Sequence, residues 1–225
     1  MLPRALNLDC IYADGHDGVA LPRHHYELLL GLVQNLDWRQ DPEGIFGRLP
    51  SFLSELDQNA QGDKFAKERM LNEASLRKCP EDILRAANNL LTDSEVMGNW
   101  LIAHKPNVRF VSVWDGAEDL DWHWDGPAGA DFFFLIYLNR HSGWLASDGG
   151  QLKVGKRGLA GNYLQANGDI EEFSSYEPAS RTLVCCNNQN PQFVHKVIPL
   201  SKGRERTVLM LGFDMIRDSS CNRTL

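Results

Sequence analysis

The chain has 225 residues, of which 43% are hydrophobic and 24% are charged, a composition typical of one globular domain with a sizeable core. Its formal net charge of −7 argues against nucleic acid as a partner, because phosphate binding requires a positive field. No apolar run approaches the roughly 20 residues that a membrane-spanning helix needs, so we expect no membrane partner.

The cysteines indicate a reducing environment. Their number is odd, and none forms a Cys-x-x-Cys pair. Cys185 and Cys186 lie in an apolar run that is typical of small buried side chains. The first residues also lack the charged-then-apolar layout of a secretory leader. We therefore expect a cytoplasmic protein.

The first part of the chain carries apolar residues at helical spacing. This spacing predicts a helix over residues 21–36, entered through Pro22, and further helices over residues 65–76, 80–91 and about 94–102. The helix over 80–91 has acidic residues in its first turn, where they interact favourably with the helix dipole. We expect residues 1–105 to form a mainly helical supporting region.

After residue 105 the sequence changes to short β-rich runs that are separated by Gly, Asn and Pro. Many short strands without strand–helix alternation are typical of a sandwich or jelly roll rather than a parallel sheet. We expect a single α+β domain over residues 1–225, with a double-stranded β-helix (jelly-roll) core over residues 106–216. The expected strands are residues 108–114, 132–138, 151–154, 181–186, 193–198 and 207–213.

The chemistry is concentrated in the segment that contains His123-Trp124-Asp125. Residues two apart on an extended strand point to the same side, so His123 and Asp125 can aim an imidazole and a carboxylate at one point. Two histidines and one carboxylate on one face of a metal are the ligand set associated with non-haem Fe(II). The set leaves positions open for a co-substrate and O₂. This pattern therefore predicts a second histidine elsewhere in the chain.

His195 meets that requirement, because it lies in a later predicted strand, 70 residues after Asp125. Two cations follow it, Arg204 and Arg206, at the start of the last predicted strand. A guanidinium at this point can hold the distal carboxylate of a dicarboxylic acid in a bidentate pair. The segment thus combines a metal ligand with a carboxylate anchor.

In their order and spacing these elements resemble the 2-oxoglutarate-dependent Fe(II) oxygenases, and within them the prolyl-hydroxylase-like branch. The resemblance covers roughly residues 107–214. The first ~100 residues carry no motif of this family. The matching elements are His123-Trp-Asp125, Ile136-Tyr-Leu-Asn139, Gly149-Gly150-x-Leu152 and His195-x-Val197-x-Pro199, followed by Gly203 and the arginines.

The resemblance implies that His123, Asp125 and His195 are ligands of Fe(II). It also implies that Tyr137 hydrogen-bonds the bound 2-oxoglutarate and that Trp114 is another aromatic residue of the pocket.

The arginine departs from the family pattern, which commonly has a single basic residue here. Arg204 and Arg206 share a parity, so both can face inward. We favour Arg206 because it leads directly into the strand expected over residues 207–213, and Arg204 stays open as the alternative.

The resemblance further implies a hydroxylase that uses Fe(II), 2-oxoglutarate and O₂, with ascorbate as an additional cofactor to be tested. The expected reaction is hydroxylation of an aliphatic C–H bond in a prolyl, peptidyl or amino-acid-like substrate, with release of succinate and CO₂. Halogenating relatives lack the carboxylate ligand, so Asp125 favours hydroxylation. The sequence does not separate a peptide or protein substrate from a small molecule, and it does not indicate an oligomeric state.

Three other functions are weighed against this one. A cupin-like metal protein that does not use 2-oxoglutarate would also present clustered histidines in a β-barrel. A nucleic-acid demethylase usually carries a second arginine six residues after the first, but this chain has Met210 and Gly212 at those positions. An inactive scaffold would not need the intact ligand set.

The remaining histidines fit no predicted constellation. His24 and His25 open a helix, His104 closes one, and His16 and His141 lie in polar turns. We interpret all five as structural or solvated.

Overall fold

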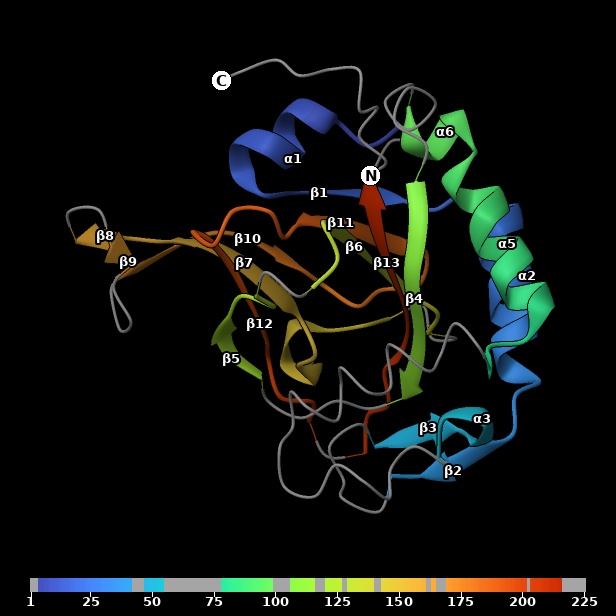
Figure 1. Ribbon diagram of the computed structural model, residues 1–225. Helices are drawn as coiled ribbons and strands as arrows, with labels where there is room; N and C mark the ends of the chain where they lie inside the picture. The colour runs from blue at the N-terminus through green and yellow to red at the C-terminus, as the bar shows by residue number, and fades with distance from the viewer. Residues whose placement is uncertain are drawn as a thin grey trace.

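The computed structural model describes residues 4–41, 47–54, 78–98, 106–115, 120–126, 129–139, 143–160, 163–164, 169–201 and 203–215. Its described strands pair in an antiparallel manner, and helices flank the larger of its sheets (Figure 1). The helix expected over residues 65–76 lies outside the described residues, as does the end of the helix expected over 94–102.

Two sheets form the centre of the fold. The larger has the strand order β1-β11-β6-β13-β4-β3-β2, and the smaller has the order β10-β7-β12-β5. From β4 to β7 and again from β10 to β13, the strands of these two sheets alternate between large and small in a pattern that fits the expected jelly roll. The strands of the larger sheet are β1 (His16–Ala20), β2 (Trp38–Gln40), β3 (Arg48–Pro50), β4 (Pro106–Asp115), β6 (Phe132–Tyr137), β11 (Thr182–Asn187) and β13 (Thr207–Met215). Those of the smaller sheet are β5 (Leu120–His123), β7 (Leu152–Arg157), β10 (Ile170–Tyr176) and β12 (Phe193–Val197).

A third, two-stranded sheet of β8 (Leu159–Ala160) and β9 (Tyr163–Leu164) projects from the sandwich (Figure 1). Its two strands lie between β7 and β10 in the chain and pair with each other, outside the two main sheets. A short 3-10 helix, η2 (Ala146–Asp148), precedes β7.

The helices pack beside the larger sheet, with α2 and α5 side by side (Figure 1). The helices predicted over residues 21–36 and 80–91 are present as α2 and α5, and α6 begins where a third was predicted. Each of α2 and α5 follows a proline, at 22 and 80, whose fixed φ suits a helix start. The helices are α1 (Leu8–Asp14), α2 (Arg23–Gln34), α3 (Ser51–Ser54), α5 (Glu81–Leu91) and α6 (Ser94–Met97).

The central strands are buried on both faces, and alternate residues belong to two different cores. On β6, Phe132, Phe134 and Ile136 join the cluster that includes α2 and α5. The residues between them, Phe133, Leu135 and Tyr137, join a second cluster with residues of β7 and β12. This period of two explains why β6 reads as a continuous apolar run. The second cluster marks the interior of the sandwich.

The N-terminal region contributes strands as well as helices. β1 extends the larger sheet through pairs from His16↔Cys186 to Ala20↔Thr182, and β2 and β3 lie at its other edge. The sequence had indicated a mainly helical region here, with His16 in a polar turn. The structure instead places His16 at the start of β1. β1 escaped notice because its sequence, His-Asp-Gly-Val-Ala, lacks an apolar run, and its burial comes from neighbouring segments.

Candidate active site

His123, Asp125 and His195 come together beside the second core, with both histidines partly buried and the Asp125 side chain 30% exposed, and we refer to them as the interior cluster. His123 ends β5 and lies directly opposite His195 of β12 in the sheet register. Asp125 follows two residues after His123. His123 Nε2 and His195 Nε2 lie 3.7 and 3.8 Å from Asp125 Oδ1, and the two imidazole ring centroids are 4.2 Å apart. The three donors therefore surround one point.

A hydrogen bond orients the imidazole ring of His123 and sets its tautomer. Its Nδ1 lies 2.7 Å from the carbonyl oxygen of Asp121, and because a carbonyl only accepts, Nδ1 carries the proton. The lone pair of Nε2 then faces Asp125. Outer hydrogen bonds of this kind set the tautomer of metal-binding histidines in general.

The electrostatics of the interior cluster favour a bound cation. Desolvation and the neighbouring His123 hold the pKa of His195 well below its ordinary value, so its imidazole is neutral, the form that coordinates metals. Desolvation also raises the pKa of Asp125, although His123 acts in the opposite direction. A divalent cation at the common point would reverse the effect on Asp125, because it favours the charged carboxylate.

Asn188, which follows directly after β11, holds the loop that carries Asp125. It is 5% exposed, and its side-chain nitrogen donates to the carbonyls of Gly126 at 3.2 Å and Ala130 at 3.0 Å. Its backbone carbonyl oxygen accepts from the indole nitrogen of Trp124 at 2.9 Å. The contacts fix both sides of Asp125. No motif pointed to Asn188, because its partners lie about 60 residues earlier in the chain.

Arg206 is a buried cation on the interior face of the same sandwich. It is 2% exposed, and it immediately precedes Thr207 at the start of β13. Its Nη1 donates to the carbonyl of Gly150 at 2.7 Å, whereas its Nε has no partner. Among the described residues, no carboxylate forms an ion pair with Arg206, and burial lowers its pKa. A buried guanidinium with an unused donor is the arrangement expected for an anion site.

Tyr137 lies beside this guanidinium. The Arg206 Cζ is 5.9 Å from the centroid of the Tyr137 ring, and the phenol is fully buried with its hydroxyl unpartnered. Burial raises the pKa of Tyr137 to about 12, so the hydroxyl keeps its proton and is available as a donor. Arg206 and Tyr137 together offer unused N–H and O–H groups to the same part of the interior.

The glycine pair before β7 packs tightly against Pro199 and Leu200, in the loop that leads to Arg206. Gly149 and Gly150 both have φ of +74°, a conformation that other residues rarely adopt. A Cβ on Gly149 would overlap the carbonyl oxygen of Pro199, and one on Gly150 would lie 2.7 Å from Cδ2 of Leu200. Larger residues would therefore push apart the two loops that meet at Arg206.

Arg204 has a different role from Arg206. Its Nε donates to Asp148 Oδ1 at 2.9 Å, and 37% of its side chain is exposed. Asp148 also accepts from the backbone nitrogen of Leu145 at 2.8 Å, so the pair ties the loop before β13 to the loop before β7. The structure brings Arg206 into the interior and leaves Arg204 at the surface.

The interior cluster and the Arg206 region share one wall, the inner face of β6. Phe133 at one end of that face has its ring centroid 5.1 Å from that of His195, and Tyr137 at the other end contacts Arg206. Phe133, Leu135 and Tyr137 alternate with the residues of the outer face. Trp114 belongs to β4, opposite Val208 of β13, but its side chain lies outside the described part of the structure.

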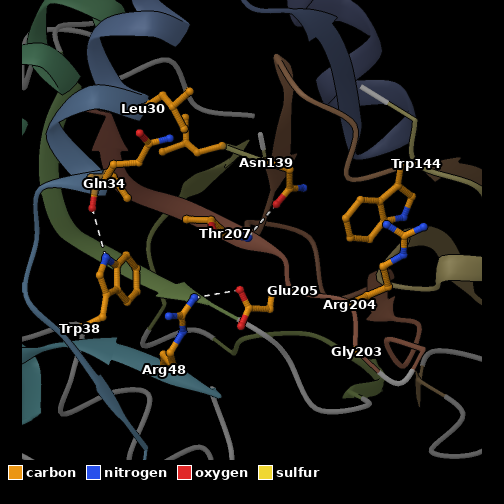
Figure 2. Close-up of a pocket in the computed structure, with 12 residues that line it drawn as sticks. Leu30, Gln34, Trp38, Arg48, Asn139, Trp144, Gly203, Arg204, Glu205 and Thr207 are labelled. Carbon is orange, nitrogen blue, oxygen red and sulfur yellow. Dashed lines mark hydrogen bonds and ion pairs between the residues drawn. The ribbon is translucent and has the colours of Figure 1, made fainter. Parts of the chain in front are cut away.

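A separate cavity of about 460 Å³ lies on the other side of Arg204, between α2, β2 and the start of β13 (Figure 2). Trp144 and Arg204 line one side of it, and Trp38 and Arg48 line the other (Figure 2). No residue of the interior cluster lines this cavity, nor does Arg206. It is therefore distinct from the candidate active site.

Comparisons with known proteins place the fold. No family model matches the sequence, and no curated protein sequence matches it. Among solved structures, an oxidoreductase of the 2OG-Fe(II) oxygenase family from Burkholderia pseudomallei is similar at a TM-score of 0.56 and 15% identity, over 91% of this chain and 87% of that one.

The non-haem alpha-ketoglutarate-dependent epimerase SnoN from nogalamycin biosynthesis has a TM-score of 0.55 at 11% identity, over 91% of this chain and 80% of that one. A Pseudomonas putida prolyl-4-hydroxylase matches at 0.44 and 21% identity, over 93% and 97%. The resemblance that the sequence indicated is confirmed at the level of the fold.

Among the described residues, no helix is long and apolar enough to cross a membrane.

Proposed function

We propose that the protein is an Fe(II)- and 2-oxoglutarate-dependent dioxygenase, with iron held by the interior cluster and 2-oxoglutarate anchored by Arg206 and Tyr137. One observation carries this proposal: a buried arginine that has no carboxylate partner among the described residues lies on the same interior wall as a cluster of two histidines and one carboxylate. A metal site alone would not require that arginine, and an anion site alone would not require the cluster.

The residues fit the iron that this function requires. Two neutral imidazoles and one carboxylate are the donor set of non-haem Fe(II) oxygenases, and three protein ligands leave room for co-substrate and O₂. Bound Fe(II) would supply O₂ activation and the oxidative decarboxylation of 2-oxoglutarate to succinate and CO₂. We propose O₂ as the second co-substrate and ascorbate as an additional cofactor. Turnover measured with and without each of them tests both.

The chain's own residues orient the co-substrate. Arg206 offers its Nε, which has no partner in the described part of the chain, to the distal carboxylate of 2-oxoglutarate, where a charge-assisted hydrogen bond can form. Tyr137 keeps its proton and donates to the same group. The apolar side chains of Phe133 and Leu135 exclude water between the two ends of the pocket. These contacts keep the keto-acid end of the molecule directed at the metal.

The proposed substrate is a prolyl, peptidyl or amino-acid-like molecule that is hydroxylated at an aliphatic C–H bond. The motif resemblance to the prolyl-hydroxylase-like branch supports this class, and the carboxylate ligand Asp125 supports hydroxylation. We further propose a cytoplasmic enzyme in which the two sheets close into a barrel over the site and the N-terminal helices support it. The alternative is a cupin-like metal protein that does not use 2-oxoglutarate.

The experiment that separates these alternatives is an anaerobic titration of the Fe(II)-loaded protein with 2-oxoglutarate. A chelated keto acid gives a weak visible charge-transfer band, and we expect this band to saturate in the wild type. In Asp125→Ala the band should be absent, because the iron is lost. If the wild-type protein binds iron but shows no band, the dioxygenase hypothesis is rejected and the cupin-like metal protein remains as the alternative.

A further inference from the structure

A second cluster with the same three donor types lies among the helices. His24 and His25 occupy the first turn of α2, and Asp93 is the N-cap residue of α6. One nitrogen of each histidine and one carboxylate oxygen lie within 4.8 Å of one another. We propose that these residues, the helix-end cluster, bind a second divalent transition-metal ion, and that Zn²⁺ is the ion that suits them.

The orientation of His24 is the first argument for a site. Consecutive residues of an α-helix point about 100° apart, so neighbouring side chains normally diverge. The rings of His24 and His25 instead lie with their centroids 4.2 Å apart and their planes tilted by 38°. His24 Nε2 is 3.8 Å from Asp93 Oδ2, although 66% of the His24 side chain is exposed. An exposed imidazole has thus turned toward the other two donors.

The second argument is that the carboxylate is held in place. Asp93 Oδ1 accepts from the backbone nitrogen of Glu95 at 2.8 Å, which leaves Oδ2 to face both histidines. The carboxylate is therefore held in one orientation, as carboxylates at metal sites are when outer hydrogen bonds orient them.

The donor set and its exposure point to zinc. Two imidazole nitrogens and one carboxylate oxygen suit Zn²⁺, which takes a water molecule as its fourth ligand when the protein supplies three. His25 Nε2 and Asp93 Oδ2 are now joined by a hydrogen bond of 2.7 Å. Coordination requires the His25 proton to be on Nδ1, and it requires the two ligand atoms to separate to about 3.3 Å, the edge of a tetrahedron with ~2.0 Å bonds. The bound ion would join the start of α2 to the start of α6.

Zinc stoichiometry tests the site in the full chain. Bound zinc is counted after equilibrium dialysis for the wild type, for His24→Ala and for the matched control Arg23→Ala. Arg23 lies on the same helical turn, is 79% exposed and pairs with Glu27, so it reports on charge and helix effects alone. We expect His24→Ala to bind one zinc ion fewer per chain than both other proteins. Equal stoichiometry in His24→Ala and Arg23→Ala would overturn the proposal.

A second measurement removes the interior cluster from the comparison. In the variant His123→Ala/His195→Ala, we expect added Zn²⁺ still to raise the melting temperature, because binding to the folded state alone stabilises it. Adding His24→Ala to this variant should abolish the increase. A melting temperature that does not respond to Zn²⁺ in the double variant would refute the helix-end site. Neither measurement involves 2-oxoglutarate, so each outcome is independent of the proposed dioxygenase activity.

Discussion

The interior cluster and the helix-end cluster contain the same donor types but differ in how the donors are held. In the interior cluster, both histidine nitrogens lie at nearly equal distances from the carboxylate, 3.7 and 3.8 Å, and come from neighbouring strands. In the helix-end cluster, the two distances are 2.7 and 3.8 Å, and a hydrogen bond already joins one pair. The strands thus hold the interior donors apart around a common point. At the helix ends, His25 and Asp93 approach closely enough to form a hydrogen bond.

The surroundings differ even more than the distances. The histidine side chains of the interior cluster are 12–13% exposed and share an inner wall with the unpaired donors of Arg206 and Tyr137. The helix-end cluster has one largely exposed histidine and lies among helices that pack against the outer face of the sheet. The donor set alone therefore does not determine the chemistry. Only the interior cluster shares a wall with a buried arginine and tyrosine that have unused donors among the described residues, and for this reason we propose catalysis there and not at the helix ends.

Removing a ligand from the interior cluster should have the largest effect. We expect Asp125→Ala to lose Fe(II) binding and all detectable 2-oxoglutarate turnover, because the two remaining imidazoles do not hold the ion on one face. Succinate release and bound iron measure both losses. Asp121→Ala is the matched control, since it removes an exposed carboxylate from β5, four residues before Asp125. Wild-type turnover in Asp125→Ala would show that the interior cluster is not the catalytic metal site.

Arg206→Ala should have the next largest effect. The substitution removes the carboxylate anchor, and we expect the KM for 2-oxoglutarate to rise by about 10- to 100-fold, as a lost charge-assisted hydrogen bond predicts. Arg204→Ala removes an ion pair with Asp148 that lies at the surface and should change the KM by no more than about 2-fold. Steady-state kinetics of both variants decide between them. A larger effect for Arg204→Ala would transfer the anchor to that residue.

These two arginines also illustrate the limit of sequence reasoning. Their equal parity left the choice open, and only the position of Asp148, 56 residues earlier, separates them. The buried strands β6, β11 and β13 were located within a few residues because continuous apolar runs predict them directly. β10 was missed, since its sequence Ile-Glu-Glu-Phe-Ser-Ser-Tyr is largely exposed and shows no apolar run.

The interior cluster was anticipated because alternation along an extended segment brings His123 and Asp125 to one side, and His195 lies in a later predicted strand where a second histidine ligand was expected. The helix-end cluster could not be anticipated, because neighbouring positions on a helix diverge and Asp93 lies 68 residues after His25. Local periodicity therefore predicts donors on one strand, but it does not predict donors that tertiary packing assembles.

Asn188→Ala tests whether the loop after β5 needs its outer hydrogen bonds. We expect Fe(II) affinity to fall by about 10-fold, because the carbonyls of Gly126 and Ala130 lose their donor and Asp125 is less firmly held. Iron titration at fixed protein concentration measures this change. Gln189→Ala is the control, because its side chain is exposed. Equal iron affinity in the two variants would mean that the loop is held by other contacts.

The smallest effect concerns Asp17, a carboxylate that is paired with arginine rather than with histidine. Its side chain is 7% exposed and accepts from Arg4 at 2.5 and 2.6 Å and from the backbone nitrogens of Asn7 and Gly18. Burial by itself raises the pKa of Asp17, but these hydrogen bonds lower it below the usual 3.8. At Asp125, by contrast, burial prevails and the pKa is raised.

The sign of the pH dependence at Asp17 follows from that lowered pKa. A carboxylate whose pKa is lower in the folded state stabilises the fold at pH values above its unfolded pKa, and this contribution is lost as the pH falls through the folded pKa. We expect wild type to exceed Asp17→Asn by about 1–2 kcal/mol in unfolding free energy near neutral pH, and the two curves to converge below about pH 3. Denaturant unfolding across this range measures the difference. A difference that stays constant down to the lowest pH would show that Asp17 stabilises the fold through packing and not through its charge. The pairing with Arg4 would then not make Asp17 electrostatically different from the carboxylates that face histidines.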